Sequence, residues 1–256
     1  IRALSAPVGA DTGDYIVTGT AEIEFLGQRN FAVGSSITTN TTLSMTPFGG
    51  QTYTIPTGSI ISAPDLIIGS GSVVFDAGST LNLTNSLTTS GGNLTINTAN
   101  FTLPSSIIIN TGSLSLNSGS TTPTVSNLTI TGSSLLGSDA LTVSNLFNWS
   151  GGTVDLDINN NGTTNMTGNV RIDTTFTNAG TLNIGGEYSS DDGSLINDAT
   201  VNWTTGNIVA LGGATSITNN NTFNISGNNS NSINFTNNGT LSKISGVATS
   251  SFTGSF

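Results

Sequence analysis

Short apolar–polar–apolar segments, each introduced by Gly or Asn, recur along most of this chain. They include residues 77–83 (AGSTLNL), 91–96 (GGNLTI), 111–116 (TGSLSL), 178–184 (NAGTLNI) and 220–225 (NNTFNI). Alternation with a period of two places every second side chain on the same face of a β-strand, so Leu182 and Ile184 are predicted to point inward and Asn183 outward. Each segment is therefore expected to form one short strand that is buried on one side.

The strand segments are separated by corners and show no helical periodicity. Asn and Gly tolerate the positive φ angles that sharp corners need, and β-branched Thr dominates the polar positions. One turn of such strands cannot bury its own apolar face, whereas stacked turns bury a continuous column, about 4.8 Å apart. Stacked Asn and Thr side chains can also hydrogen-bond from turn to turn. The sequence therefore predicts an all-β fold, a β-solenoid (parallel β-helix).

The first part of the chain differs from the rest. Residues 1–59 hold three of the six prolines and lack the Gly-x-Leu-x-Ile spelling of the repeat. An uncovered end of a solenoid is an exposed sheet edge, which natural proteins protect. We expect residues 1–59 to form an N-terminal β cap or a small separate β region, and residues 60–256 to form the solenoid.

A longer echo relates two parts of the predicted solenoid. LFNWSGGTVDL (146–156) matches TVNWTTGNIVAL (200–211), with the two tryptophans 54 residues apart. FTNAGTLNI (176–184) matches FTNNGTLSKI (235–244), with the two phenylalanines 59 residues apart. The similar distances predict a super-repeat made of several strands.

These Thr-Asn-x-Gly-Thr-Leu and Asn-Trp-x-x-Gly units resemble the degenerate repeats of large bacterial β-helical surface proteins, of the autotransporter-passenger and filamentous-haemagglutinin type. The resemblance covers about residues 70–245. It implies a role in adhesion or structure outside the cell. The Asn-Pro-Asn secretion motif of haemagglutinin-like proteins is missing from the N-terminal part, so the resemblance does not indicate the export route.

Charge and cysteine content limit the kinds of partner and the location that can be expected for this chain. The 256 residues carry a net charge of −10 with only four cations, too few to neutralise a nucleic-acid backbone. No apolar run approaches the ~18 residues of a membrane span. A Cys-free, Lys-poor chain rich in Thr, Asn and Ser is typical of prokaryotic extracellular or cell-surface proteins. We therefore expect no nucleic-acid partner, no membrane insertion and an extracellular location.

The side chains offer little for catalysis. Without His or Cys, the Ser-His-Asp and Cys-His arrangements cannot form. Asp191 and Asp192 are the only adjacent acidic pair, and paired carboxylates can cleave a glycosidic bond. A solvated turn is the favoured interpretation of that pair, and Arg171 is expected on an outward strand position beside Asp173. No catalytic residue is predicted; a polysaccharide lyase or hydrolase on a β-helix is the alternative.

One segment resembles the opening of a calcium loop. Asp157, Asn159 and Asn161 precede Gly162 with the spacing of such a loop. The twelfth position, where a bidentate Glu is required, is Gly168. No cofactor is predicted, and a Ca²⁺ ion held by these three residues is the alternative to a strand that ends in an Asn-rich corner.

Trp149 and Trp203 occupy equivalent positions of the longer echo. Exposed indole rings can stack on sugars and would make these residues a carbohydrate platform. A repeated Trp can equally fill the core or a corner of each super-repeat, which is the favoured interpretation.

Arrays of Thr-x-Thr on a flat solenoid face can order water and bind ice. Here Thr-x-Thr occurs at residues 52–54 and 129–131, among other places, without a constant offset from the repeat. The sequence therefore does not predict such an array.

Together these features predict a secreted, non-enzymatic structural protein, a subunit of an extracellular fibre, sheath or cell-surface adhesin. Self-association end to end or by strand addition is the expected partnership. A carbohydrate-binding adhesin domain with glycan partners is a further alternative.

Overall fold

The computed structural model describes residues 10–11, 13–20, 22–119, 122–247 and 249–256. The regular secondary structure in these ranges consists of β-strands alone. The strands pair in parallel and stack as a β-solenoid of about 12 turns. No helix in these ranges is long and apolar enough to cross a membrane. The predicted all-β solenoid is confirmed.

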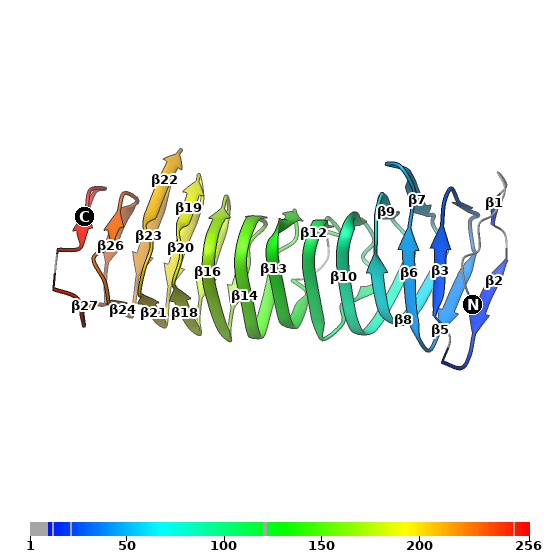
Figure 1. Cartoon of the computed structure of the whole chain (residues 1–256), viewed down its shortest axis with the longest axis horizontal. Coiled ribbons are helices and arrows are strands. Elements are labelled where there is room, and N and C mark those ends of the chain that lie inside the picture. The colour runs from blue at the N-terminus through cyan, green and yellow to red at the C-terminus, as the bar shows by residue number, and fades with distance from the viewer. Residues whose placement is uncertain (1–9, 12, 21, 120–121, 248) are drawn as a thin grey trace. The chain divides into compact units, whose positions relative to one another are not determined.

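The strands belong to two compact units (Figure 1). Unit 1 comprises residues 1–125 and 135–139, and unit 2 comprises residues 126–134 and 140–256. The long strand β13 (Thr124–Gly137) supplies residues to both units.

Unit 1 is built from three parallel ladders. The first contains β2 (Asp14–Val17), β5 (Ser36–Thr39), β8 (Ile60–Ile68), β10 (Thr80–Ile96) and β11 (Phe101–Thr102). The second contains β3 (Ile23–Leu26), β6 (Thr42–Thr46), later parts of β8 and β10, and β12 (Ser106–Leu116). The third contains β7 (Thr52–Ile55), β9 (Ser72–Phe75) and the ends of β10 and β12. β1 (Ala10–Asp11) pairs with β4 (Asn30–Phe31).

The ladders of unit 1 continue across the predicted boundary between residues 59 and 60. β5 pairs with β8 over Ser36–Thr38 and Ile60–Ser62, without a register shift. Strands β2, β3, β5, β6 and β7 thus already belong to turns of the solenoid, and the division between compact units falls near residues 125–140. These early turns lack the Gly-x-Leu-x-Ile motif but keep the alternation of buried and exposed residues. They can pair with later turns because strand pairing depends on that alternation. A capping role for these turns stays a prediction.

Unit 2 also contains three parallel ladders, all of which pass through β14 (Leu141–Asp155). Ladder A continues through β15 (Ile158–Asn160), β17 (Thr175–Asn178), β20 (Ser194–Asn197), β23 (Ser216–Asn219) and β26 (Asn234–Asn237). Ladder B continues through β16 (Thr163–Ile172), β18 (Thr181–Ile184), β21 (Thr200–Trp203), β24 (Thr222–Ile225) and β27 (Thr240–Lys243). Ladder C continues through β16, β19 (Tyr188–Asp191), β22 (Ile208–Gly212), β25 (Ser230–Asn231) and β28 (Ser251–Phe252).

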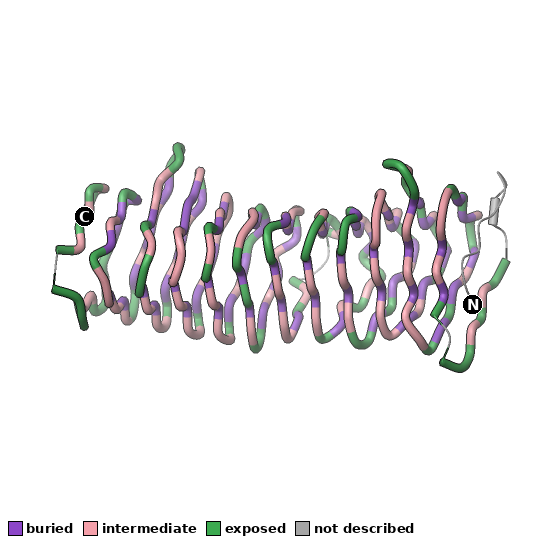
Figure 2. Tube along the Cα trace, viewed as in Figure 1, coloured by how far each residue is buried: buried purple, intermediate pink, exposed green. Residues whose placement is uncertain are grey.

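In most strands alternate residues are buried in the core (Figure 2). In β18, Leu182 and Ile184 are fully buried while Asn183 is partly exposed, as the alternation predicts. The inward residues of successive turns stack in register, so Phe176 lies over Leu195 and Leu195 over Ile217. These columns remove apolar surface from water and supply the main stabilisation of the fold.

The longer sequence echo corresponds to three turns of unit 2. Trp149 pairs with Met166, which pairs with Ile184, which in turn pairs with Trp203. The two phenylalanines of the other echo, Phe176 and Phe235, are likewise three turns apart in ladder A. The predicted super-repeat of several strands is thus a block of three turns.

Candidate functional site

The most regular polar feature is a column of inward asparagines at one corner of unit 2, here called the inner Asn ladder. Its members are the last residues of successive strands in ladder A: Asn160, Asn178, Asn197, Asn219 and Asn237. Each Nδ2 donates to the Oδ1 of the next member, at 2.8, 2.8, 2.7 and 2.7 Å in chain order. The first four members are fully buried.

The inner Asn ladder also satisfies the backbone at the corner. Asn197 Nδ2 donates to the carbonyl oxygens of Ala199 in its own turn (3.3 Å) and Thr222 in the next (2.9 Å). A carbonyl oxygen can only accept, so these contacts determine which side of the amide carries nitrogen. A buried, satisfied polar network of this kind rigidifies the structure around it.

The inner Asn ladder begins where asparagine replaces an apolar residue. Asn160 pairs in ladder A with Val143 of the preceding turn, which cannot donate a hydrogen bond. The Oδ1 atom of Asn160 is accordingly buried without a partner among the described residues. The ladder therefore has a defined first turn within unit 2.

A second column of asparagines, the outer Asn ladder, lies on the solvent side of ladder B. It contains Asn148, Asn165, Asn183, Asn202 and Asn224. Each Nδ2 donates to the Oδ1 of the preceding turn, at 3.1, 2.9, 3.0 and 3.1 Å. The two Asn ladders therefore run in opposite directions, one donating toward the C-terminus and the other toward the N-terminus.

A column of threonines, the Thr column, runs beside the outer Asn ladder. It contains the first residues of five strands of ladder B: Thr163, Thr181, Thr200, Thr222 and Thr240. The hydroxyl of Thr222 donates to Asn221 Oδ1 at 3.2 Å. The hydroxyls of the other four form no hydrogen bond with the described residues, so they are available to water or a ligand.

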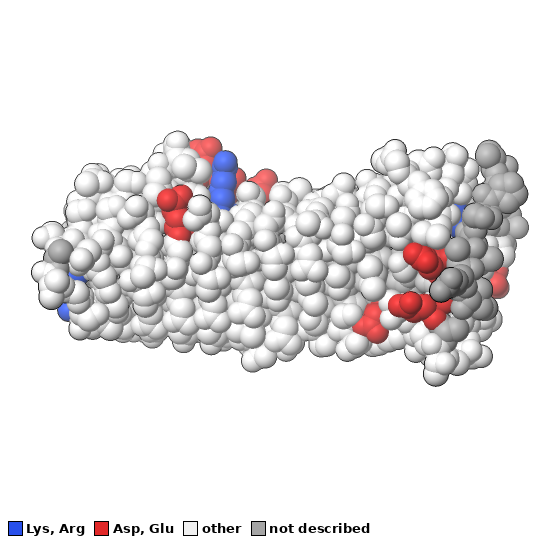
Figure 3. All heavy atoms as spheres, in the orientation of Figure 1, with Lys and Arg blue, Asp and Glu red and all other residues white. Residues whose placement is uncertain are grey.

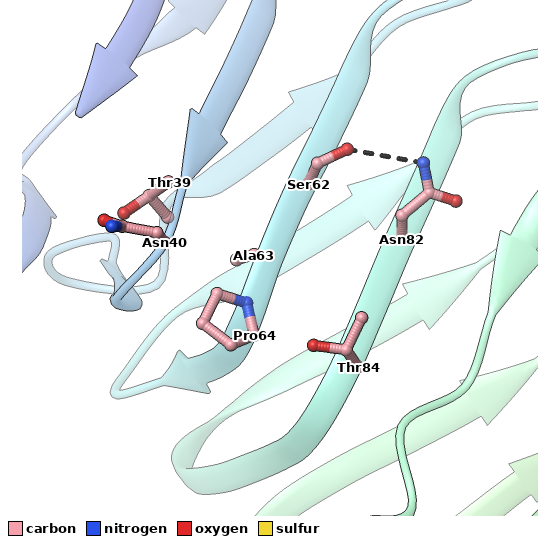
Figure 4. Close-up of a pocket in the computed structure, with 7 residues that line it drawn as sticks. All are labelled: Thr39, Asn40, Ser62, Ala63, Pro64, Asn82 and Thr84. Carbon is pink, nitrogen blue, oxygen red and sulfur yellow. Dashed lines mark hydrogen bonds between the residues drawn. The ribbon is translucent and has the colours of Figure 1, made fainter. Parts of the chain in front are cut away.

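Unit 1 carries a shallow groove of about 360 Å³ on its outer surface (Figure 4). Its lining residues are Thr39, Asn40, Ser62, Ala63, Pro64, Asn82 and Thr84. Asn82 Nδ2 donates to Ser62 Oγ at 3.3 Å, and Ala63 and Pro64 contribute apolar surface between the polar groups. None of these residues is charged, so the groove suits an uncharged ligand rich in hydroxyl groups.

Trp149 and Trp203 do not present their rings to solvent. Both are fully buried, and their indole Nε1 atoms donate to the carbonyl oxygens of Gly151 and Gly206, each at 3.0 Å. Trp149 stacks on Phe147 with ring centroids 5.3 Å apart. The sugar-platform alternative therefore fails for these two residues, and the core interpretation is correct, because their inward strand positions bury them.

Asp157, Asn159 and Asn161 occupy separate structural positions. Asp157 is exposed, and its Oδ1 accepts from the backbone nitrogen of Thr175 at 2.9 Å. Asn159 is a partly exposed strand residue, whereas Asn161 is exposed at the following corner. Among the described residues no three His, Cys, Asp or Glu side chains gather as a metal site. The positions of these three residues therefore give no support for a Ca²⁺ site beyond the incomplete loop spacing in the sequence.

The two carboxylates of the acidic pair, Asp191 and Asp192, contact different partners. Arg171 Nε donates to both carboxylate oxygens of Asp173 at 2.8 Å, and Nη2 lies 3.3 Å from Asp191. The hydrogen bond that Arg171 donates to Asp173 is the main cause of the raised pKa of Arg171. Asp192 adopts a left-handed backbone conformation, and its Oδ1 accepts from Ala214 N at 2.8 Å. The predicted contact of Arg171 with Asp173 is confirmed.

Large parts of the visible surface carry no charged side chain (Figure 3). Comparisons with family models, curated proteins and solved structures found no match to this chain. The protein is thus placed by its own geometry in the class of parallel β-solenoids.

Sequence reasoning missed which asparagines turn inward. It foresaw ladders of stacked Asn and Thr, but assigned the Asn-rich segments to corners. The missed signal is an Asn three residues before a Thr, as in Asn178/Thr181, Asn197/Thr200 and Asn219/Thr222. That spacing places the Asn at the inner end of one strand and the Thr at the start of the next.

Proposed function

We propose that this protein is a non-enzymatic structural element of a secreted or cell-surface assembly, such as a fibre, a sheath or the stalk of an adhesin. The inner Asn ladder supports this role, because it joins five successive turns with side-chain hydrogen bonds, the first three of which are buried. Such a network stiffens the solenoid along the stacking direction. The cysteine-free composition agrees with the proposed prokaryotic extracellular location.

The stiffness can be tested by pulling the full chain between its termini in a force spectrometer. We expect the unfolding event assigned to unit 2 to occur at lower force in Asn197→Ala than in the parent protein. Asn183→Ala, which removes a partly exposed amide of the outer Asn ladder, is the matched control. Equal unfolding forces for Asn197→Ala and the parent protein would contradict the proposed mechanical role.

The proposal includes self-association end to end or by strand addition. Parallel ladders offer backbone donors and acceptors to an added strand wherever an edge is uncovered. Sedimentation velocity and negative-stain imaging over a hundredfold range of concentration (about two orders of magnitude) would detect such assemblies. Particles of constant mass across the range would count against self-association while leaving the mechanical role open.

The groove of unit 1 supports glycan binding as a second candidate function. It combines the amides of Asn40 and Asn82 with the apolar surface of Ala63 and Pro64, and none of its lining residues is charged. A panel of neutral oligosaccharides titrated against the full chain, followed by NMR, would test it. We expect Asn82→Ala to weaken binding about fivefold, the loss of roughly one hydrogen bond. Thr54→Ala, an exposed strand residue outside the groove, should leave binding unchanged.

A further inference from the structure

The Thr column and the outer Asn ladder form a regular array on ladder B of unit 2. Four successive turns carry Thr and Asn two residues apart, at 163/165, 181/183, 200/202 and 222/224. Pairing across these four turns contains no register shift. Turns repeat every ~4.8 Å, and alternate residues of a strand are about 6.6 Å apart, so the array has a fixed repeat in two directions.

Two Asn ladders join neighbouring turns of this array and oppose its twisting. Sheets normally twist by about 20° per strand, and flat sheets of many strands rely on stacking or on side-chain ladders. The outer Asn ladder keeps each amide within 3.1 Å of its neighbour across ladder B. The inner Asn ladder holds the adjoining corner through carbonyl oxygens of the same threonines, including Thr200 at 3.0 Å and Thr222 at 2.9 Å. A twist large enough to disorder the array would break both sets of bonds.

The array offers unused hydrogen-bonding groups and no charge. The Thr163, Thr181 and Thr200 hydroxyls have no partner among the described residues, and these side chains are partly exposed. Each amide inside the outer Asn ladder uses one N–H and one oxygen lone pair, which leaves one of each for solvent. The chain carries a net charge of −10, yet the array consists of neutral Thr and Asn. It is complementary to an uncharged partner that both donates and accepts hydrogen bonds.

We propose that this array binds the surface of ice. A small soluble ligand is normally held in a concave pocket, whereas a periodic, neutral array of partly exposed side chains matches a solid with its own surface lattice. The oxygen repeat along one axis of hexagonal ice is slightly shorter than the spacing between turns of a β-solenoid. Waters held by Thr hydroxyls and flanked by Thr methyl groups would occupy lattice positions of the crystal. This binding is independent of the proposed structural role and of the groove in unit 1.

Ice-affinity partitioning of the full chain, with ice recrystallisation measured in parallel, tests the proposal. We expect the parent protein to enter growing ice, and Thr200→Tyr to lower its partitioning by about tenfold, because a bulky ring at the centre breaks the surface match. The matched control is Thr95→Tyr, at a partly exposed strand position of unit 1. This control should partition like the parent protein.

A second variant, Thr181→Tyr, protects the test against a local folding defect at residue 200, and thermal unfolding by circular dichroism checks each variant. Loss of partitioning in both folded array variants supports the proposal. Exclusion of the parent protein from ice overturns it, and so does equal partitioning of parent and both array variants. Binding to insoluble cellulose or chitin without entry into ice overturns it in favour of a crystalline polysaccharide.

Discussion

Units 1 and 2 share a three-sided parallel architecture but bury different polar side chains at their corners. Unit 1 stacks hydroxyls: Ser35, Ser59 and Ser79 are buried, and the Ser35 and Ser59 oxygens are 3.2 Å apart. Unit 2 stacks the amides of the inner Asn ladder. A hydroxyl has one hydrogen to donate, whereas an amide has two donors and an acceptor. Ser59 Oγ lies 3.1 Å from Ala32 O as well as near Ser35 Oγ, but it has one proton for both, whereas an Asn amide can donate to the next turn and to the backbone at once.

The corner position itself shows the same contrast. Where ladder A of unit 2 places Asn178, Asn197 and Asn219, the first ladder of unit 1 places Thr39, Ala63 and Leu83 in corresponding strand-end positions. Ala63 and Leu83 are apolar, and the Thr39 hydroxyl bonds to Thr41 in its own turn, so these contacts do not join one turn to the next at that position. The same fold can thus be stabilised mainly by apolar packing, or by apolar packing together with a buried polar network. The arrangement with the polar network is more sensitive to single substitutions.

The largest effect is expected for Asn197→Ala. It removes the acceptor of Asn178 Nδ2 and the donor to Thr222 O, and so leaves several buried groups unpaired, at a cost of about 3–5 kcal/mol in the free energy of unfolding. Ser59→Ala in unit 1 should cost about 1–2 kcal/mol, since it removes one hydroxyl. Denaturant unfolding of both variants measures the difference. Equal losses would show that the two corners do not differ in the proposed way.

The next effect concerns the close stacking of corners in unit 2. A Cβ atom added at Gly180 would lie 2.0 Å from the carbonyl oxygen of Gly162, so the backbone must shift. We expect Gly180→Ala to lower the free energy of unfolding by about 2–4 kcal/mol. At Gly185 the nearest atom is 3.5 Å away, an ordinary contact. A Gly185→Ala variant as unstable as Gly180→Ala would refute the close-contact explanation.

Tyr188 predicts a pH dependence for unit 2. Burial raises the pKa of its phenol above the ordinary value of 10.0, with a smaller opposing effect from Ser190. The folded state therefore binds the proton more tightly than the unfolded state. Stability is fully present below pH 10 and falls above it, with a slope of up to about 1.4 kcal/mol per pH unit.

Thermal unfolding between pH 9 and 11 (roughly one unit on either side of the ordinary tyrosine pKa) would measure this slope. The Tyr188 hydroxyl is buried and makes no hydrogen bond in the described structure. Tyr188→Phe should therefore fold normally and lose this contribution to the alkaline slope. If the Phe variant retained the whole slope, the phenol of Tyr188 would not be its source.

The smallest effect is expected for Asn183→Ala in the outer Asn ladder. Its amide is partly exposed, and water can replace its bonds to Asn165 and Asn202. The free energy of unfolding should fall by about 0.5–1 kcal/mol. Chemical denaturation would measure this change in the free energy of unfolding. A loss as large as that of Asn197→Ala would mean that burial does not determine how much an Asn ladder contributes to stability.

Much of the strand pattern could be predicted from the sequence, because alternation of apolar and polar residues is local. Leu182 and Ile184 face inward as predicted, and the echo of Trp149 and Trp203 reflects real structural equivalence. The candidate sites were less predictable. Asn160 is polar and lies in an Asn-rich run, yet it faces inward, where its Nδ2 donates to the amide oxygen of Asn178 one turn away.

The sequence by itself determined the class of fold. Period-two alternation, corner residues and the lack of helical periodicity leave stacked short strands as the way to bury the apolar side chains. Only the tertiary structure decided which asparagines are buried and which threonines stack as the Thr column. It also decided that the ladders of unit 1 continue across the predicted boundary between residues 59 and 60. Those outcomes depend on register between turns about 20 residues apart, such as Ile60 and Thr80. Register is a contact between distant segments, and corners of varying length hide it from any local pattern.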